Sequence, residues 1–161
     1  MKDAMLNAYQ VNLSYARELI DDIPDAQMAD QPVAGMNHPA WLLGHLVVTG
    51  GSMLSLLGAD APCKQAWKDL FAGGTKPLAD RFKYPDKGTL YRALGECHDR
   101  VTRAFQEAAP EVLDKALEGP MANKFPTVRS LLMFGLTSHE AVHLGQLSAW
   151  RRAKGMPPVK I

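Results

Sequence analysis

Two histidines spaced four residues apart, His139 and His143, have the clearest capacity for chemistry in this sequence. Residues at positions i and i+4 lie on one face of an α-helix, so the two imidazoles could hold one metal ion. A third histidine, His45, lies far upstream in a strongly apolar segment. Three imidazoles from two helices would leave a vacant coordination position for water or a substrate. The sequence therefore predicts a divalent metal site on these three residues.

A competing interpretation is that each histidine is separately hydrogen-bonded or lines a polar groove. Burying an unpartnered imidazole costs roughly a few kcal/mol. His139 and His143 nevertheless fall on a stripe that otherwise reads as core, extended by Leu132, Leu136 and Trp150. One ion would satisfy several buried nitrogens together, so we favour the metal site.

The segment His139–His143 also matches H-E-x-x-H, the zinc-protease signature. The metzincin extension would need glycine and histidine where this chain has Gln146 and Ala149. The other zincin type needs a downstream acidic residue, and none follows Glu140. We therefore disfavour a protease.

Glu140 is the one candidate catalytic residue that this motif suggests. It is turned about 100° around the helix from His139, so it need not face the metal. It could accept a hydrogen bond from a ligand imidazole. It could equally be a charge in solvent or between helices, so its role stays open.

Composition favours one compact domain covering residues 1–161, because the chain has 47% hydrophobic residues and a length suited to a single core. A formal charge of +1 argues against a nucleic-acid surface. Cys63 and Cys97 are too few for a disulfide scaffold. The N-terminal residues lack the apolar core of a signal peptide. We therefore expect a cytoplasmic protein with reduced thiols.

The segment from Pro39 to Ala59 has no charged residue and is long enough to span a bilayer. It contains His45 and several glycines and hydroxyl residues, and no basic cluster flanks it. We therefore expect the central helix of a soluble protein and no membrane partner.

Apolar residues recur every three or four positions in four stretches, which predicts an all-α fold. The expected helices cover about residues 3–22, 39–58, 90–109 and 128–154. Asn37, Thr89 and Thr127 are the expected N-caps of the last three. A long linker over 59–88 holds a short helix at 65–71. Four long helices indicate a four-helix bundle, and the long connections indicate crossovers.

The chain resembles the DinB family of helical metal-binding proteins over almost its whole length. The resemblance rests mainly on Asn37–Leu46 (NHPAWLLGHL) and His139–Gln146 (HEAVHLGQ). The segments Leu70–Gly74, Tyr84–Pro85 and Arg151–Pro158 also resemble the family's connection and ending.

This resemblance implies an antiparallel four-helix bundle of distinctive topology, often assembled as a homodimer. It implies zinc or nickel held by three histidines, which correspond to His45, His139 and His143. Family members include S-transferases that use low-molecular-weight thiols and a thiol-dependent maleylpyruvate isomerase. A small-molecule substrate, with a low-molecular-weight thiol, is therefore expected.

Three functions remain open: a metal-dependent thiol S-transferase or hydrolase, a non-catalytic metal-binding or stress-response bundle, and a metal-free structural bundle. In the enzyme, Asn37, His38, Trp41 and Trp150 are pocket candidates, although both tryptophans could be core. His38 is expected to be exposed or at the pocket mouth. His98 lies one position off the apolar stripe of the third helix and is expected at the edge of its buried face, whereas Cys97 falls on that stripe.

Overall fold

The computed structural model describes residues 2–60 and 63–160, and within these ranges the fold is helical, with a single isolated bridge and no strand. The all-α prediction is confirmed. The long helices are α1 (Lys2–Ile20), α2 (Pro39–Leu56), α4 (Lys87–Glu107) and a continuous segment made of α6 (Val128–Phe134), η3 (Gly135–His139) and α7 (Glu140–Ala153). Shorter elements are η1 (Asp25–Gln27), α3 (Gln65–Phe71), η2 (Arg81–Lys83) and α5 (Pro110–Leu113).

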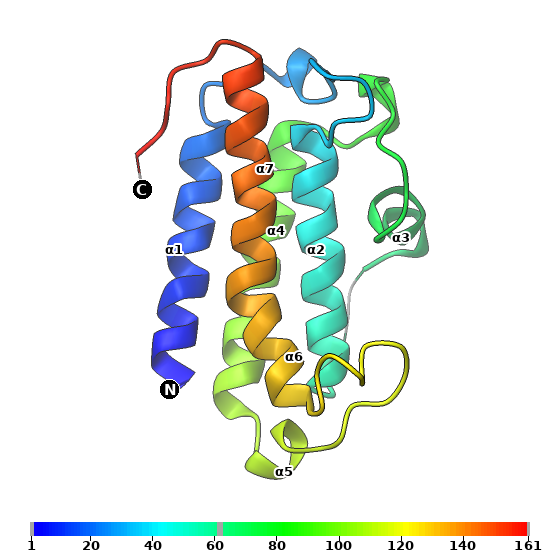
Figure 1. The fold of residues 1–161 in the computed structure, drawn as a ribbon, viewed down its shortest axis with the longest axis vertical. Coiled ribbons are helices and arrows are strands. Elements are labelled where there is room, and N and C mark those ends of the chain that lie inside the picture. Colours follow the sequence, from blue (N-terminus) through cyan, green and yellow to red (C-terminus); the bar gives the residue numbers. More distant parts are fainter. Residues whose placement is uncertain (1, 61–62, 161) are drawn as a thin grey trace.

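The long helices form a ring in which α2 contacts α4, α4 contacts α1, α1 contacts α7 and α7 contacts α2. Figure 1 shows that α1 and α7 run in one direction while α2 and α4 run in the other. Directions therefore do not alternate around the ring, because α2 and α4 are parallel neighbours. The connection between them must return along the molecule, which explains the long predicted linker. Residues 61–62 of that linker lie outside the described residues.

Helix α2 differs from the other long helices because it is buried on nearly all sides. It is long and apolar enough to cross a membrane, yet 72% of it is buried inside the protein, as in the core helix of a soluble protein. Gly44 permits one close approach, since a Cβ atom there would lie 2.4 Å from the Phe71 ring. This contact places α3 directly against the N-terminal half of α2.

Helix caps correct two of the sequence expectations. The N-cap of α2 is His38, whose Nδ1 accepts a hydrogen bond from the Trp41 backbone N–H at 3.2 Å, rather than Asn37. The N-cap of α4 is Asp86 rather than Thr89. In both cases the side chain of the observed cap, His38 or Asp86, accepts a hydrogen bond from a free backbone N–H of the first turn. Thr127 caps α6 as predicted, in a capping box with Ser130.

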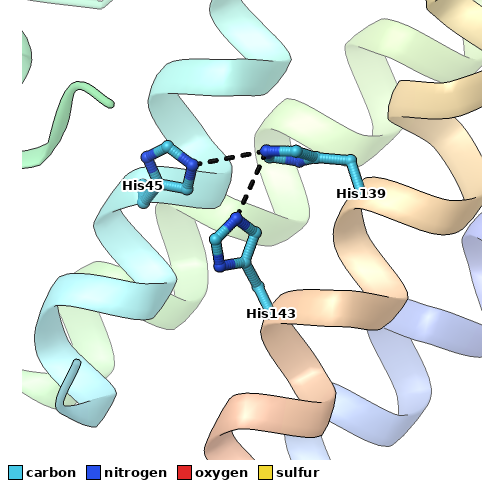
Figure 2. A group of neighbouring side chains, drawn as sticks. All are labelled: His45, His139 and His143. Atoms are coloured by element: carbon cyan, nitrogen blue, oxygen red, sulfur yellow. Dashed lines mark hydrogen bonds between the residues drawn. The ribbon is translucent and has the colours of Figure 1, made fainter. Parts of the chain in front are cut away.

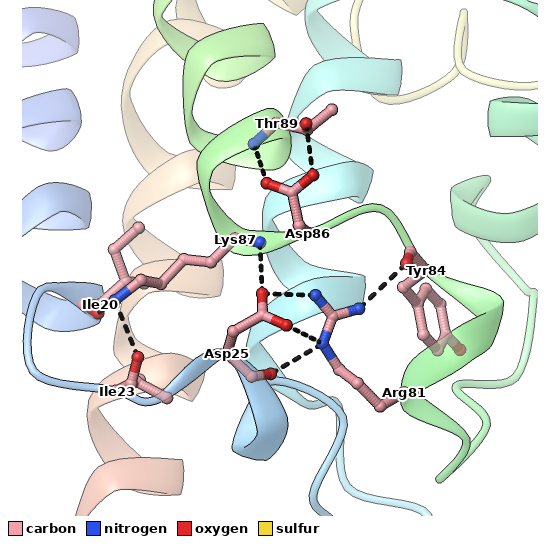
Figure 3. A network of polar contacts seen from close by, with 8 residues as sticks. All are labelled: Ile20, Ile23, Asp25, Arg81, Tyr84, Asp86, Lys87 and Thr89. Carbon is pink, nitrogen blue, oxygen red and sulfur yellow. Dashed lines mark hydrogen bonds and ion pairs between the residues drawn. The ribbon is translucent and has the colours of Figure 1, made fainter.

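A polar network fastens the end of the linker to the end of α1 (Figure 3). The Asp25 carboxylate accepts hydrogen bonds from the Arg81 guanidinium at 2.6 Å and from the Lys87 backbone N–H at 2.7 Å. The Lys87 ammonium donates to the Ile20 and Ile23 carbonyls at 3.2 and 2.8 Å. A cation at these carbonyls complements the negative end of α1. The network fixes where the linker enters α4.

Candidate metal centre

The structure brings His45, His139 and His143 together from three elements (Figure 2). His45 lies on α2, His139 is the last residue of η3, and His143 lies in the first turn of α7. The His139 Nε2 is 3.4 Å from the His45 Nε2 and 3.2 Å from the His143 Nε2. One ligand atom from each residue lies within 4.8 Å of the others. The three histidines form a group that could hold one metal ion.

The spacing of these nitrogens matches the geometry of a shared ion. Tetrahedral zinc binds imidazole nitrogen at about 2.0–2.1 Å, which separates neighbouring ligand atoms by about 3.3–3.4 Å. The two Nε2–Nε2 distances from His139, 3.4 and 3.2 Å, are close to that separation. Facing lone pairs repel one another unless a proton or a cation lies between them. The donor set therefore fits a divalent cation.

Hydrogen bonds on the far side of two rings direct their Nε2 lone pairs inward. The His45 Nδ1 is 2.8 Å from the Phe71 carbonyl, which can only accept, so Nδ1 carries the proton. The His143 Nδ1 is 3.3 Å from the Gln146 Oε1, which also accepts a hydrogen bond from the Asn37 amide at 3.0 Å. Such outer hydrogen bonds set the tautomer and orientation of metal-binding histidines.

His139 differs from the other two because its Nδ1 is buried without a hydrogen-bond partner among the described residues. Its backbone also differs, since it ends the π-helical segment η3. Short π-helical turns inside α-helices are frequent at functional sites. The i, i+4 pattern predicted a plain helix through this region and gave no signal for the π turn.

Burial keeps these imidazoles neutral. Desolvation lowers the pKa of His139 and His143 to about 4, and the neighbouring histidines add to the effect. Burial also lowers the pKa of His45, against the opposing hydrogen bond to Phe71. A neutral imidazole is the form that binds metal, so all three lone pairs are available at neutral pH.

Aromatic rings enclose the group on two sides. The Trp41 ring stacks on the His45 ring with centroids 4.8 Å apart and an interplanar angle of 7°. The Phe134 ring meets the His139 ring edge-on at 5.7 Å. The Trp41 indole N–H donates to the Thr75 hydroxyl at 2.9 Å, which ties this wall to the linker. Trp41 therefore lies against His45 of the converging group.

The other pocket candidates lie in different surroundings. Asn37 reaches the site indirectly, through Gln146. His38 is fully buried, rather than exposed, and its Nε2 lies 3.0 Å from the Leu78 carbonyl. Trp150 is also fully buried and donates its indole N–H to the Asp30 carbonyl at 2.7 Å. His38 and Trp150 thus have structural contacts that need no ligand.

Glu140 pairs with His98, which the sequence predicts at the edge of the apolar face of its helix and which is in fact fully buried in the middle of α4. The Glu140 Oε1 is 2.7 Å from the His98 Nε2, and their side chains are 4% and 0% exposed. The Tyr9 ring stacks on the His98 ring at 3.6 Å. Burial raises the pKa of Glu140, and the hydrogen bond with His98 opposes this shift. Of the roles left open for Glu140, the structure shows an inter-helix contact between α7 and α4.

Comparison with known families places this geometry in context. Residues 8–147 match the DinB superfamily, a stretch that contains all three converging histidines. The chain belongs to the DinB superfamily. The resemblance drawn from its motifs is therefore confirmed. No curated protein matches the chain.

Proposed function

We propose that this DinB-superfamily protein is a metal-dependent thiol S-transferase acting on a small molecule. Zinc or nickel would be held by the Nε2 atoms of His45, His139 and His143. The observation that carries the proposal is their convergence at 3.2 and 3.4 Å, with outer hydrogen bonds on two of the three rings. Such an ion, when bound, supplies a Lewis acid that lowers the pKa of a thiol or water at its open position.

The protein's own groups would orient the ligands and exclude water. The Phe71 carbonyl holds His45, and Gln146 holds His143. Trp41 and Phe134 cover ring faces and edges beside the site. An apolar, partly closed surrounding strengthens electrostatic interactions between the site and a reacting group.

Among the described residues no carboxylate is hydrogen-bonded to the three histidines, and this favours S-transfer over hydrolysis. Glu140 is instead hydrogen-bonded to His98. Hydrolysis usually employs a general base to take the proton from water. A thiol has a pKa of about 8.5, far below that of water, so it needs less assistance to ionise. Hydrolysis by the same site is the alternative reaction.

The proposal also covers the helix arrangement, the cellular location and the oligomeric state. We propose that the four long helical segments form the four-helix bundle of the family as one domain, residues 1–161, and that the protein is a cytoplasmic homodimer. The ring of helix contacts supports the bundle. The homodimer rests on the family resemblance, and the cytoplasmic location rests on the sequence. The formal charge of +1 supports a small-molecule substrate rather than nucleic acid, and no membrane partner is proposed.

The test is thiol-dependent turnover by the metal-loaded protein. Glutathione or cysteine would be offered with 1-chloro-2,4-dinitrobenzene, so that a C–S bond forms as chloride leaves and the thiol proton passes to solvent. We expect turnover with zinc or nickel and little after chelation or in His45→Ala. A Cys63→Ser, Cys97→Ser double variant should retain turnover, because the sulfur comes from the added thiol.

A different result would redirect the proposal. Tight metal binding with no turnover across a panel of thiols and electrophiles would contradict the S-transferase and support a non-catalytic metal-binding or stress-response bundle. Turnover unaffected by chelation would contradict the role of the metal.

A further inference from the structure

A cavity of about 360 Å³ lies between α2, α3 and α4, and none of the three converging histidines lines it. Small-molecule sites typically occupy about 300–1,000 Å³, so this cavity is large enough for a small organic ligand. Its lining residues come from all three helices and from the two residues just before α3: Val47, Gly51, Cys63, Lys64, Trp67, Thr89, Ala93, Glu96, Cys97 and Arg100.

The lining divides into an apolar part and a charged part. Val47, Ala93, Cys97 and the half-buried Trp67 provide apolar surface and one aromatic ring. Lys64, Arg100 and Glu96 provide two cations and one anion. An apolar wall with a small number of charged groups is the usual composition of a site for an amphipathic ligand. The excess of positive charge favours an anionic group on that ligand.

Arg100 is held in place at this cavity. Its Nη2 donates to the Asp60 carbonyl at 2.6 Å, which fixes the guanidinium without neutralising its charge. Lys64 is exposed and stands at the N-cap of α3. Glu96 is also exposed, so water screens its repulsion of an anion as it screens the attraction of Lys64, and the half-buried Arg100 is the less screened charge. A fixed guanidinium is well suited to bind a carboxylate or a sulfonate.

The two thiols at the cavity are poorly suited to covalent chemistry. Burial raises the pKa of Cys97 to about 12, and burial also raises the pKa of Cys63. The thiolate is the reactive form of cysteine, so both residues are weak nucleophiles at neutral pH. The Cys97 thiol donates to the Val47 carbonyl at 3.7 Å, as expected for a packed side chain. The cavity is therefore built for non-covalent binding.

We propose that this cavity binds a small organic anion with an apolar body, independently of the metal centre. The body lies against Trp67 and Ala93, and the anionic group lies near Lys64 and Arg100. Helix α3 contributes to both sites. The ring centroids of Trp67 and Phe71 are 5.4 Å apart, and the Phe71 carbonyl accepts a hydrogen bond from the His45 Nδ1. The proposal does not depend on the reaction at the histidines.

The test uses 1-anilinonaphthalene-8-sulfonate, an apolar anion whose fluorescence rises on binding, with the full-length, metal-loaded protein. We expect saturable binding at one site, weakened about tenfold by Lys64→Glu and by the cavity-filling Ala93→Leu. Lys160→Glu, at an exposed cation beside α1, and Gly95→Leu on α4 are matched controls outside the lining, and Gly95 faces open space. These controls should change the dissociation constant less than about twofold.

A second probe separates recognition of charge from apolar sorption. N-phenyl-1-naphthylamine lacks the sulfonate, so its binding should be weaker and insensitive to Lys64→Glu. Equal affinity for both probes, no saturable binding, or equal effects of the lining and control variants would overturn the proposal. Circular dichroism and urea unfolding of each variant show whether lost binding reflects lost folding.

Discussion

The five histidines of this chain divide into two groups whose surroundings differ. His38 and His98 are fully buried, and each has an acceptor in the protein on its Nε2, a carbonyl or a carboxylate. His45, His139 and His143 instead direct their Nε2 atoms at one another. Burial alone therefore does not separate a structural histidine from a metal ligand. What separates them is whether the protein itself satisfies the inward nitrogen.

The position of the Glu140 carboxylate also distinguishes the two groups of histidines. Glu140 follows His139 directly in sequence, yet its carboxylate contacts His98 on the other side of the helix. The converging group keeps three neutral nitrogens without a counter-charge, an arrangement that a cation stabilises. In the His98–Glu140 pair the protein itself supplies the partner of the His98 Nε2, although the His98 Nδ1 and the Glu140 Oε2 are buried without a hydrogen-bond partner among the described residues.

The largest expected effect concerns the converging group. His45→Ala should lower metal affinity by more than about 100-fold, because it removes a direct ligand, whereas loss of an outer hydrogen bond typically costs about 10–100-fold. Helix content should be retained. Competition with a chromogenic chelator measures the affinity. His38→Asn, which keeps a good N-cap residue, is the matched control and should bind metal normally. Equal affinities in wild type and His45→Ala would remove His45 from the site.

The next effect concerns the paired group. Glu140→Ala should destabilise the fold by about 1–3 kcal/mol, because it leaves the His98 Nε2 buried without its hydrogen-bond partner. Metal affinity of the folded variant should change less than about tenfold, since Glu140 holds no ligand imidazole. Urea unfolding and chelator competition measure the two quantities, with Glu96→Ala as an exposed control on α4. Loss of metal binding with unchanged stability would assign Glu140 to the metal centre, and the two groups of histidines would then not differ as described.

A smaller effect should appear with pH. Burial lowers the pKa of His38 to about 4 from 6.5, so the folded state favours the neutral ring. Its contribution to stability is complete above about pH 6.5 and is lost as pH falls toward about 4. Between pH 7 and pH 5, wild type should therefore lose roughly 1–2 kcal/mol more than His38→Asn. Urea unfolding at both pH values measures this, and equal losses would show that His38 is protonated without cost.

The smallest effect concerns an outer contact of the metal group. Gln146→Ala removes the acceptor beside the His143 Nδ1 and should weaken metal binding about tenfold. Stability without metal should change by less than about 1 kcal/mol, because the contact is partly exposed. Gln146→Glu should restore or exceed wild-type affinity, since it keeps an acceptor. Identical affinities for all three proteins would show that the contact does not orient His143.

Local patterning was sufficient to predict the helices and the three converging histidines. Histidines at i and i+4 share a helical face, and His45 lay on the apolar stripe of its own helix. The caps were less predictable. Asp86 competes with Thr89, another good N-cap residue, and His38 caps α2 although asparagine is the stronger capping residue, because the Asn37 amide is hydrogen-bonded to Gln146. The His98–Glu140 pair joins two helices far apart in sequence, and periodicity carries no information on such contacts. The π turn before Glu140 likewise depends on tertiary packing.

The most direct test of the metal centre is elemental analysis of untagged protein purified without added metal, with His139→Ala beside it. The account predicts close to one zinc or nickel per chain in wild type and almost none in the variant. No metal in wild type, and none taken up when zinc or nickel is supplied, would contradict it. Equal metal content in the two proteins would also contradict it, because His139 lies next to both other ligands.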